Sequence, residues 1–366
     1  MQIRAAVARA RAPFELVDCE LAAPGPGEVL VEVEACGLCR TDLSAKDHGY
    51  GTPLPAVLGH EGVGRVLTRG AGVRSLEPGQ RVIMSYGACG RCPSCAARMP
   101  AYCDHAMDYN VFGRRPDGDS PITLDGAPIT GHFFGQSAFA THAVAAVTNL
   151  VPIDDDLPAA MMCALACGVQ TGVGAVVNVL RAGPGDAVGI FGCGTVGLSA
   201  VMAARLAGCE SILAVDRRRD RLERARALGA TGVLPSEGLG RAELERALRE
   251  LGGLTRAFDN TGSAPIIEAA FAALRRRGVL VLAGVSPPRA TVAFDANRLM
   301  SSGRVVRGTI EGDADPTEFI PQMIAWYRRG ALPLEALVTT YPFAQINAAA
   351  RDMTEGRVIK PVLLMR

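Results

Sequence analysis

The most regular hydrophobic pattern in the chain lies between residues 169 and 303, where short apolar runs alternate with amphipathic segments. The runs AVGIF, SILAVD and VLVLAGV have the length of buried strands. Segments such as RDRLERARALGA and APIIEAAFAALRRRG separate them and place apolar residues at helical spacing. This alternation predicts a doubly wound parallel sheet wrapped by helices over residues 169–303.

A different pattern occupies residues 1–168 and 304–366. Short β-branched runs that end at glycine, such as GEVLVEVEACG and GVGRVLTRGAG, predict strands rolled into a barrel-like sheet. Residues 104–137 carry the turn signals DGDSP and DGAP without apolar periodicity, so we expect a long loop there. In the tail, PTEFIPQMIAWYRRG predicts a helix. We therefore expect two domains, one formed by 1–168 with 304–366 and the other by 169–303.

Composition and charge restrict the class of protein. A chain of 366 residues with 49% hydrophobic and 20% charged residues is long enough for two globular domains. Its formal net charge of +1 gives no reason to expect binding to nucleic acid or to an anionic membrane. Neither a membrane span nor a signal peptide is recognisable, and 11 cysteines, an odd number, argue against a disulfide framework. We expect a cytoplasmic protein whose clustered cysteines bind metal.

Three glycines form a candidate dinucleotide site. Gly192, Gly194 and Gly197 give the pattern G-x-G-x-x-G between a predicted strand and a predicted helix, the context that this motif requires. Asp216 ends the next predicted strand, where a carboxylate can accept hydrogen bonds from the adenosine ribose and would repel a 2′-phosphate. NAD is therefore favoured over NADP. The run Arg217–Arg219 leaves NADP open, because an arginine in this place can bind a 2′-phosphate.

Four cysteines lie close together in the spacing C-x2-C-x2-C-x7-C. Four thiolates on one short segment can close around zinc with no position left for water, which describes a structural site. Metal binding would also explain how the turn-rich residues 87–104 stay ordered without a hydrophobic core. An iron–sulfur cluster is the alternative occupant. The four are Cys89, Cys92, Cys95 and Cys103.

A second, dispersed group also has zinc-binding side chains. Cys39, His60 and Cys167 match the two-cysteine, one-histidine type of catalytic zinc site, which keeps a fourth position open, and Glu61 follows the histidine. The spacing alone does not select this set, because Cys36 and Cys163 compete with Cys39 and Cys167.

Several motifs, taken in order, resemble those of the zinc-containing medium-chain alcohol dehydrogenases. They are CGLCRTD, GHEGVG, CGRCPSC followed by YC, ACGVQTG and FGCGTVGLSA, and the resemblance covers essentially the whole chain. The segments HFFGQSAFA, NVFGRRPDG, CGVQTGVGAVVN and EGDADPTEFIPQMIAWYRRG are similar to the bacterial aryl-alcohol branch, which includes benzyl alcohol and geraniol dehydrogenases. The resemblance implies a GroES-like catalytic domain, a Rossmann NAD domain, two zinc ions per chain and a homodimer or homotetramer.

The resemblance also implies roles at the catalytic zinc. Cys39, His60 and Cys167 would bind the metal, Glu61 would lie behind it, and Asp42 would fix His60. Thr41 would hydrogen-bond the alcohol oxygen. Liver-type members carry a histidine as the outer group of a proton relay where this chain has Ser44, so the proton would leave directly to water or through His48.

For the cofactor, the resemblance places two basic residues, Arg40 and Lys360, at the pyrophosphate. The remaining implied contacts lie in or beside the Rossmann segment. They are Thr171, Val196, Arg221 and the backbone of Ala283–Val285, including Gly284 and Val285.

The substrate is the least determined part. Leu43, Ser85, Tyr86, Phe133 and Phe134 are candidates for the pocket wall, which would suit an aromatic or allylic primary alcohol. One alternative is a thiol-dependent formaldehyde dehydrogenase, for which Arg114 and Arg115 would have to form a basic patch. A second alternative is a zinc-ribbon interaction protein with a cofactor-sensing domain.

Overall fold

The computed structural model describes residues 1–48, 51–115 and 118–365. Residues 116 and 117 of the motif NVFGRRPDG therefore lie outside the described part. The chain divides into two compact units, Met1–Cys167 with Asp315–Arg366 and Gly168–Ala314. The second boundary falls later than residue 303, where the sequence pattern predicted it, because strand β16 (Val305–Gly308) pairs in parallel with β15 (Leu274–Leu282) of the second unit.

The second unit is built around one parallel sheet. Its strand order is β13-β12-β11-β14-β15-β16, and every neighbouring pair is parallel. Counted from β11, this is the doubly wound order 3-2-1-4-5-6. The strands β11 and β12 are almost fully buried, as expected for strands covered on both faces. The remaining bounds are β11 (Ala187–Phe191), β12 (Ser211–Asp216), β13 (Gly232–Pro235) and β14 (Leu254–Asp259).

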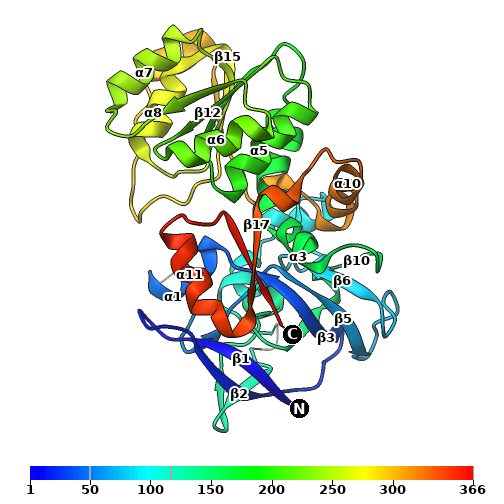
Figure 1. Cartoon of the computed structure of the whole chain (residues 1–366). Helices are drawn as coiled ribbons and strands as arrows, with labels where there is room; N and C mark the ends of the chain where they lie inside the picture. The colour runs from blue at the N-terminus through cyan, green and yellow to red at the C-terminus, as the bar shows by residue number, and fades with distance from the viewer. Residues whose placement is uncertain (49–50, 116–117, 366) are drawn as a thin grey trace. The chain divides into compact units, whose positions relative to one another are not determined.

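Helices cover this sheet, as the periodicity predicted (Figure 1). Helix α5 (Thr195–Leu206) follows β11 and is buried along most of its length, whereas α6 (Arg219–Leu228) buries only the stripe formed by Leu222, Ala225 and Leu228. The other helices of the unit are α4 (Gly168–Gly174), η6 (Ala175–Leu180), α7 (Arg241–Glu250), α8 (Ala264–Ala273) and α9 (Ala296–Ser302).

The first unit contains two mainly antiparallel sheets. One has the order β10-β6-β5-β3-β18-β17, with β9 also paired to β3, and the other has the order β4-β1-β2-β7-β8. A single apolar core contains residues of both sheets, including Val7, Val31 and Phe139. The strands are β1 (Gln2–Ala8), β2 (Glu15–Leu21), β3 (Glu28–Gly37), β4 (Ala56–Val57), β5 (Gly62–Arg69), β6 (Arg81–Met84), β7 (Ile122–Leu124), β8 (Ala127–Ile129), β9 (His142–Ala146), β10 (Leu150–Pro152), β17 (Val338–Pro342) and β18 (Lys360–Leu364).

The predicted loop over residues 104–137 is not a continuous loop. It holds the π-helix η2 (Met107–Val111), the hairpin β7–β8 and the turn η3 (Phe133–Gly135). Asp125 and Gly126 both have positive φ, at 52° and 79°, as a two-residue hairpin turn requires. The strands are only three residues long, too short for a periodic pattern, but Ile122 and Ile129 bury their side chains in the core.

The predicted helix in the tail is confirmed as α10 (Pro316–Arg328), which begins where Asp315 accepts a hydrogen bond from the Thr317 amide. It is followed by α11 (Ile346–Thr354). Among the described residues, no single helix is long and apolar enough to cross a membrane, although the consecutive pair Ala159–Ala166 and Gly168–Leu180 meets that test when taken together.

Candidate functional site

Four metal-binding side chains converge inside the first unit. The ligand atoms of Cys39, His60, Glu61 and Cys167 all lie within 4.8 Å of one another. Cys39 precedes helix α1 (Arg40–Asp47), His60 and Glu61 precede β5, and Cys167 follows the short helix η5 (Cys163–Ala166). The competing thiols Cys36 and Cys163 are fully buried, and burial raises the pKa of each.

One carboxylate positions two members of this set. Asp42 Oδ2 accepts a hydrogen bond from the Cys39 amide at 2.9 Å, and Asp42 Oδ1 lies 2.8 Å from His60 Nδ1. With Nδ1 held in this way, Nε2 is the nitrogen left for a metal. Nε2 is buried and has no hydrogen-bond partner among the described residues, so the site fits a cation at that atom.

Glu61 is paired with a buried lysine. Lys360 Nζ lies 2.6 Å from both carboxylate oxygens of Glu61, and both residues are almost fully buried. Burial raises the pKa of Glu61 to about 7, and the ammonium of Lys360 opposes that rise. Gly37 makes room for the pair, because a Cβ at this position would lie 2.0 Å from Glu61 Oε2.

The thiol of Cys39 ionises more readily than an ordinary cysteine thiol. Its pKa lies well below the ordinary value, first because of its hydrogen bond with the Cys167 thiol and also because of the positive charge of Lys360, which together outweigh burial. A thiolate is the form of cysteine that binds metal.

Two of the three predicted proton-relay residues, Thr41 and Ser44, lie on α1, the helix that follows Cys39. Thr41 Oγ1 is 3.7 Å from Cys39 Sγ, which places its hydroxyl at the donor set. Ser44 follows one turn later on α1, and His48 is the exposed residue that caps the end of the helix.

Two phenylalanines pack on the histidine. The ring of Phe134 lies 4.5 Å from the His60 ring, tilted by 32°, and Phe133 makes an edge contact with the same ring at 5.8 Å. Phe134 has φ 52° and ψ 34°, a left-handed conformation that costs a non-glycine residue free energy. Asn149 Nδ2 donates a hydrogen bond to the Phe134 carbonyl at 3.1 Å and holds the turn in place.

The other predicted wall residues have mixed positions. Leu43 packs against the core and is half-buried, and Tyr86 is buried. Ser85 is fully buried and donates its hydroxyl to the carbonyl of Ala166, the residue before Cys167, at 2.7 Å. It therefore supports the position of a thiol.

The sequence analysis missed Gln136. This buried amide donates through Nε2 to the carbonyls of His60, Met84 and Ser85, at 3.0, 3.2 and 2.9 Å. Its Oε1 accepts a hydrogen bond from the Gly62 amide at 3.1 Å. The only signal in the sequence is a lone glutamine within the apolar segment HFFGQSAFA.

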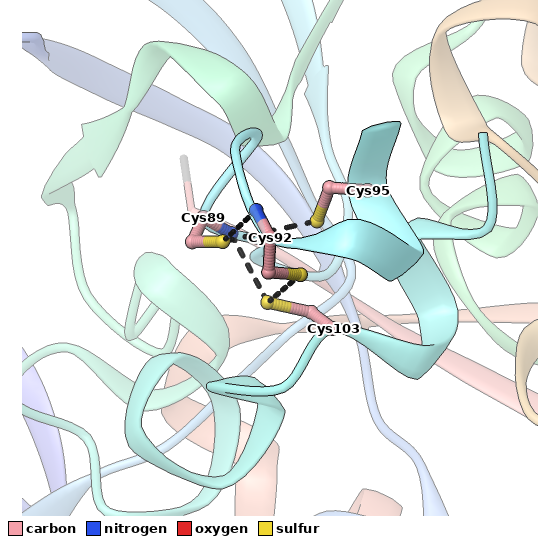
Figure 2. Close-up of side chains that lie close together, drawn as sticks. All are labelled: Cys89, Cys92, Cys95 and Cys103. Carbon is pink, nitrogen blue, oxygen red and sulfur yellow. Dashed lines mark hydrogen bonds between the residues drawn. The ribbon is translucent and has the colours of Figure 1, made fainter. Parts of the chain in front are cut away.

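The four local cysteines form the second metal-binding set, and Figure 2 shows their sulfurs turned toward one another. Two sulfur–sulfur distances, Cys89–Cys95 and Cys92–Cys103, are 3.9 Å. A tetrahedral site with Zn–S bonds of about 2.3 Å needs sulfurs separated by roughly 3.8 Å, so the set fits zinc.

Backbone amides support these thiols. Cys92 Sγ accepts from the Asp104 amide at 3.5 Å, and Cys103 Sγ accepts from the Cys89 and His105 amides at 3.3 and 3.4 Å. The Asp104 amide is the main cause that lowers the pKa of Cys92 to about 6. The apolar cluster around these thiols is small, as expected for a segment that depends on metal.

The glycine motif forms the turn between β11 and α5. Gly192 has φ +90°, which favours glycine, and a Cβ on Gly197 would lie 1.7 Å from the Gly192 carbonyl oxygen. A Cβ on Gly194 would meet nothing within 4 Å, so the backbone there is open to an approaching group. Gly194 is the residue that precedes α5, and the first amides of a helix have no partner within the helix, so this end can bind an anion.

Asp216 ends β12 next to this turn. Its Oδ2 accepts a hydrogen bond from the Cys193 amide at 2.7 Å, and its Oδ1 accepts one from the Arg218 amide at 2.8 Å. Each oxygen keeps a further lone pair for a hydroxyl donor.

The remaining cofactor candidates are divided between the units, with Arg40 and Lys360 in the first and the others in the second. Arg40 is exposed at the start of α1, whereas the Lys360 ammonium is turned to Glu61 rather than to solvent. The Thr171 hydroxyl donates to Glu311 Oε2 at 3.3 Å. Of the others, Val285 is 73% exposed, Val196 and Arg221 are half-buried in α5 and α6, and a Cβ on Gly284 would lie 2.2 Å from the Gly262 nitrogen.

The arginines considered for a basic patch are in different situations. Arg115 binds the buried carboxylate of Glu28, with Nη2 2.9 Å from Oε2. Arg114 and Arg115 both line a pocket of about 590 Å³ in the first unit, together with Arg91, His105 and Asp108. The two arginines are thus brought together as a basic patch would require, but Glu28 balances the charge of Arg115 and Asp108 adds a negative charge to the lining.

Comparison with known proteins agrees with these observations. Residues 25–155 match the alcohol dehydrogenase GroES-like domain, and residues 195–329 match the zinc-binding dehydrogenase domain. The chain is 40% identical to the geraniol dehydrogenase of Castellaniella defragrans, over 96% of this chain and 94% of that protein. It is 34% identical to the S-(hydroxymethyl)glutathione dehydrogenase of Paracoccus denitrificans over 100% of both. The crystal structure of benzyl alcohol dehydrogenase from Acinetobacter calcoaceticus has a TM-score of 0.95 and 38% identity, covering 100% of both chains. These matches confirm the predicted pairing of a GroES-like domain with a Rossmann domain.

Proposed function

Because the chain belongs to the zinc-containing alcohol dehydrogenase family, we propose that it oxidises an aromatic or allylic primary alcohol to the aldehyde and transfers the hydride to NAD. The observation that carries this proposal is the convergence of Cys39, Cys167 and the buried His60, whose Nε2 has no hydrogen-bond partner among the described residues. A zinc-ribbon interaction protein would need only the four-cysteine set, and the chain gathers a second one.

In this function, Cys39, His60 and Cys167 would hold the catalytic zinc, and Glu61 is paired with Lys360. Zinc bound there acts as a Lewis acid and makes the substrate hydroxyl more acidic. The Thr41 hydroxyl, beside Cys39, accepts the proton of the substrate hydroxyl. The proton then leaves to water along α1, where Ser44 and the exposed His48 follow.

NAD, as the hydride acceptor, binds to the second unit. The open backbone at Gly194 and the start of α5 receive the pyrophosphate, and Asp216 accepts hydrogen bonds from the ribose hydroxyls. Arg40, Thr171, Val196, Arg221, Gly284 and Val285 remain our candidates for further cofactor contacts.

Aromatic contacts support the choice of substrate class. The half-buried Phe134 lies against the His60 ring, and an aromatic ring at this place favours a flat, unsaturated group. Phe133 is fully buried and supports this arrangement from within the core. Relatives named for geraniol and benzyl alcohol agree with such a substrate.

We also propose that the protein forms a homo-oligomer through β16. This strand is at the edge of its sheet, with Val305 47% exposed and the nearby Met300 and Ile310 75% and 54% exposed. An apolar edge of this kind can pair with the same edge of a second copy about a two-fold axis. Light scattering of the native protein should give at least twice the 38.2 kDa mass of the chain, and a monomer would contradict the proposal.

Two measurements test the function. Elemental analysis should find two zinc ions per chain, whereas one ion would contradict the catalytic site. NADH absorbance should then rise with benzyl alcohol or geraniol and not with formaldehyde plus glutathione or another thiol. The opposite order of activity would favour the thiol-dependent reaction, for which the pocket beside Arg114 would be the binding site.

A further inference from the structure

Three consecutive arginines follow Asp216, and one of them, Arg218, is bonded to this aspartate through its backbone. The backbone amide of Arg218 donates a hydrogen bond to Asp216 Oδ1 at 2.8 Å. Arg218 is therefore next to the carboxylate that we expect to bind the adenosine ribose. It is the residue that precedes α6, whereas Arg217 and Arg219 are exposed. An arginine so placed has the chemistry to bind a 2′-phosphate.

The guanidinium of Arg218 is already occupied. Nε and Nη2 each lie 3.0 Å from one oxygen of Asp220, which makes a two-point fork between planar groups. The hydrogen bond to Arg218 also lowers the pKa of Asp220, so this carboxylate is ionised at neutral pH. Asp216 therefore accepts a hydrogen bond from the backbone of Arg218, and Asp220 binds the side chain of the same arginine.

We propose that Asp220 is a specificity-determining residue for the cofactor, because it occupies the guanidinium of Arg218 and keeps this arginine from binding the 2′-phosphate of NADP. The inference rests on the proposed function, since it assumes that the adenosine ribose binds at Asp216. Asp220 also adds a negative charge that repels a dianionic phosphate. The arginine run would then favour NADP only when Asp220 is removed.

Asp220 has a second, purely structural role that the test must separate. It lies in the first turn of α6, a helix of 10 residues, where a negative charge stabilises the helix N-terminus. That role does not involve Arg218 and predicts no change in cofactor preference. The pair is partly exposed, with side-chain exposures of 36% and 50%, so its loss should cost little stability.

Adenosine 2′,5′-bisphosphate and 5′-AMP are suitable probes, because they report on the adenosine site without catalysis or metal. In the full-length protein, calorimetry should show that Asp220→Asn raises the affinity for the bisphosphate about tenfold, the order expected for one charge-assisted pair, and leaves 5′-AMP binding nearly unchanged. The kcat/KM ratio of NADP to NAD should rise by a similar factor.

Two double variants give the matched control. Asp220→Asn with Arg218→Ala should lose the gain, whereas Asp220→Asn with Arg217→Ala, which has the same net charge, should keep it. Equal gains in both double variants, or no gain in Asp220→Asn, would overturn the inference. If Asp220→Asn melts more than a few degrees below wild type, Asp220→Ser replaces it under the same criteria. If the wild-type protein binds neither 5′-AMP nor NADH, both the proposed function and this inference are wrong. If it binds NADH normally but Asp220→Asn shows no gain in affinity for the bisphosphate, only the inference is wrong.

Discussion

Lys360 Nζ and the carboxylate of Glu61 form a buried ion pair, with 2.6 Å to each oxygen, and Glu61 belongs to the candidate metal set with Cys39, His60 and Cys167. Lys360 begins β18 and Glu61 precedes β5, so the pair joins residues 299 positions apart in the sequence. The lysine predicted at the cofactor pyrophosphate thus contacts a residue of the metal set.

Lys360→Ala should destabilise the protein strongly, because it leaves the Glu61 carboxylate buried without a counter-charge. Removing one partner of a buried pair costs about 3–5 kcal/mol of unfolding free energy. Urea denaturation followed by the fluorescence of Trp326 measures this, since the single tryptophan of the chain lies in α10 of the first unit. The paired variant Lys360→Met with Glu61→Gln, which removes both charges, should lose less. A loss below about 1 kcal/mol in Lys360→Ala would contradict a charged buried pair.

Cys92→Ser should open the four-cysteine site and release one zinc ion per chain. The melting temperature should fall by several degrees, because the segment has little apolar core to replace the metal. Zinc content and thermal melting measure the two effects. Cys209→Ser, at a cysteine outside both donor sets, is the control and should keep both ions. If Cys92→Ser stayed fully folded yet inactive, our division between structural and catalytic sites would be wrong.

His60→Ala should abolish turnover and leave NADH binding intact. The substitution removes a metal-binding atom from the first unit, whereas the glycine turn and Asp216 belong to the second. Fluorescence titration with NADH and steady-state assays separate the two effects. His142→Ala, on β9 and outside the donor sets, should retain activity. Loss of NADH binding in His60→Ala would count against the role given to this residue.

Phe134→Ala should lower kcat/KM for benzyl alcohol roughly tenfold while changing that for ethanol little, because an aromatic contact is worth about 0.5–1.5 kcal/mol beyond the buried area. The comparison of the two alcohols corrects for any change in the metal set. Phe112→Ala removes a phenylalanine that is 39% exposed and is not stacked on His60, and should leave the ratio near that of wild type. Equal losses for both alcohols would indicate that Phe134 supports His60 rather than the substrate.

Local patterns in the sequence predicted the glycine turn between β11 and α5 and the clustering of the four cysteines well. In both, the residues that act together are neighbours in the chain, so spacing carries the geometric information. The Gly192 turn needs only a strand before it and a helix after it, and Cys89, Cys92 and Cys95 lie within seven consecutive residues.

The catalytic donor set is different because its members come from three distant segments. No spacing rule separates Cys39 from Cys36 or Cys167 from Cys163, and only tertiary packing buries one of each pair away from His60. The family resemblance supplied the assignment that local pattern could not.

Three further differences have the same physical origin. The hairpin β7–β8 was not predicted, because its strands are too short to show a periodic hydrophobic pattern. The boundary of the second unit differs from the predicted residue 303 because β16 belongs to that unit only through its pairing with β15. Gln136 was not predicted because its structural role depends on carbonyls from two distant segments, at His60 and at Met84.

Asp42 accepts three hydrogen bonds in the donor set, from the Cys39 amide, the Gly59 amide and the His60 ring. An asparagine has the same shape but offers only one acceptor oxygen, so its NH₂ group would have to face a donor at one of these places. Asparagine therefore cannot replace Asp42. Glutamate cannot replace it either, because the position is fully buried and leaves no room for a longer side chain. In a protein redesigned for another substrate, residue 42 is one that a library should leave unchanged, since a single replacement would disturb a helix start, a turn and an imidazole together.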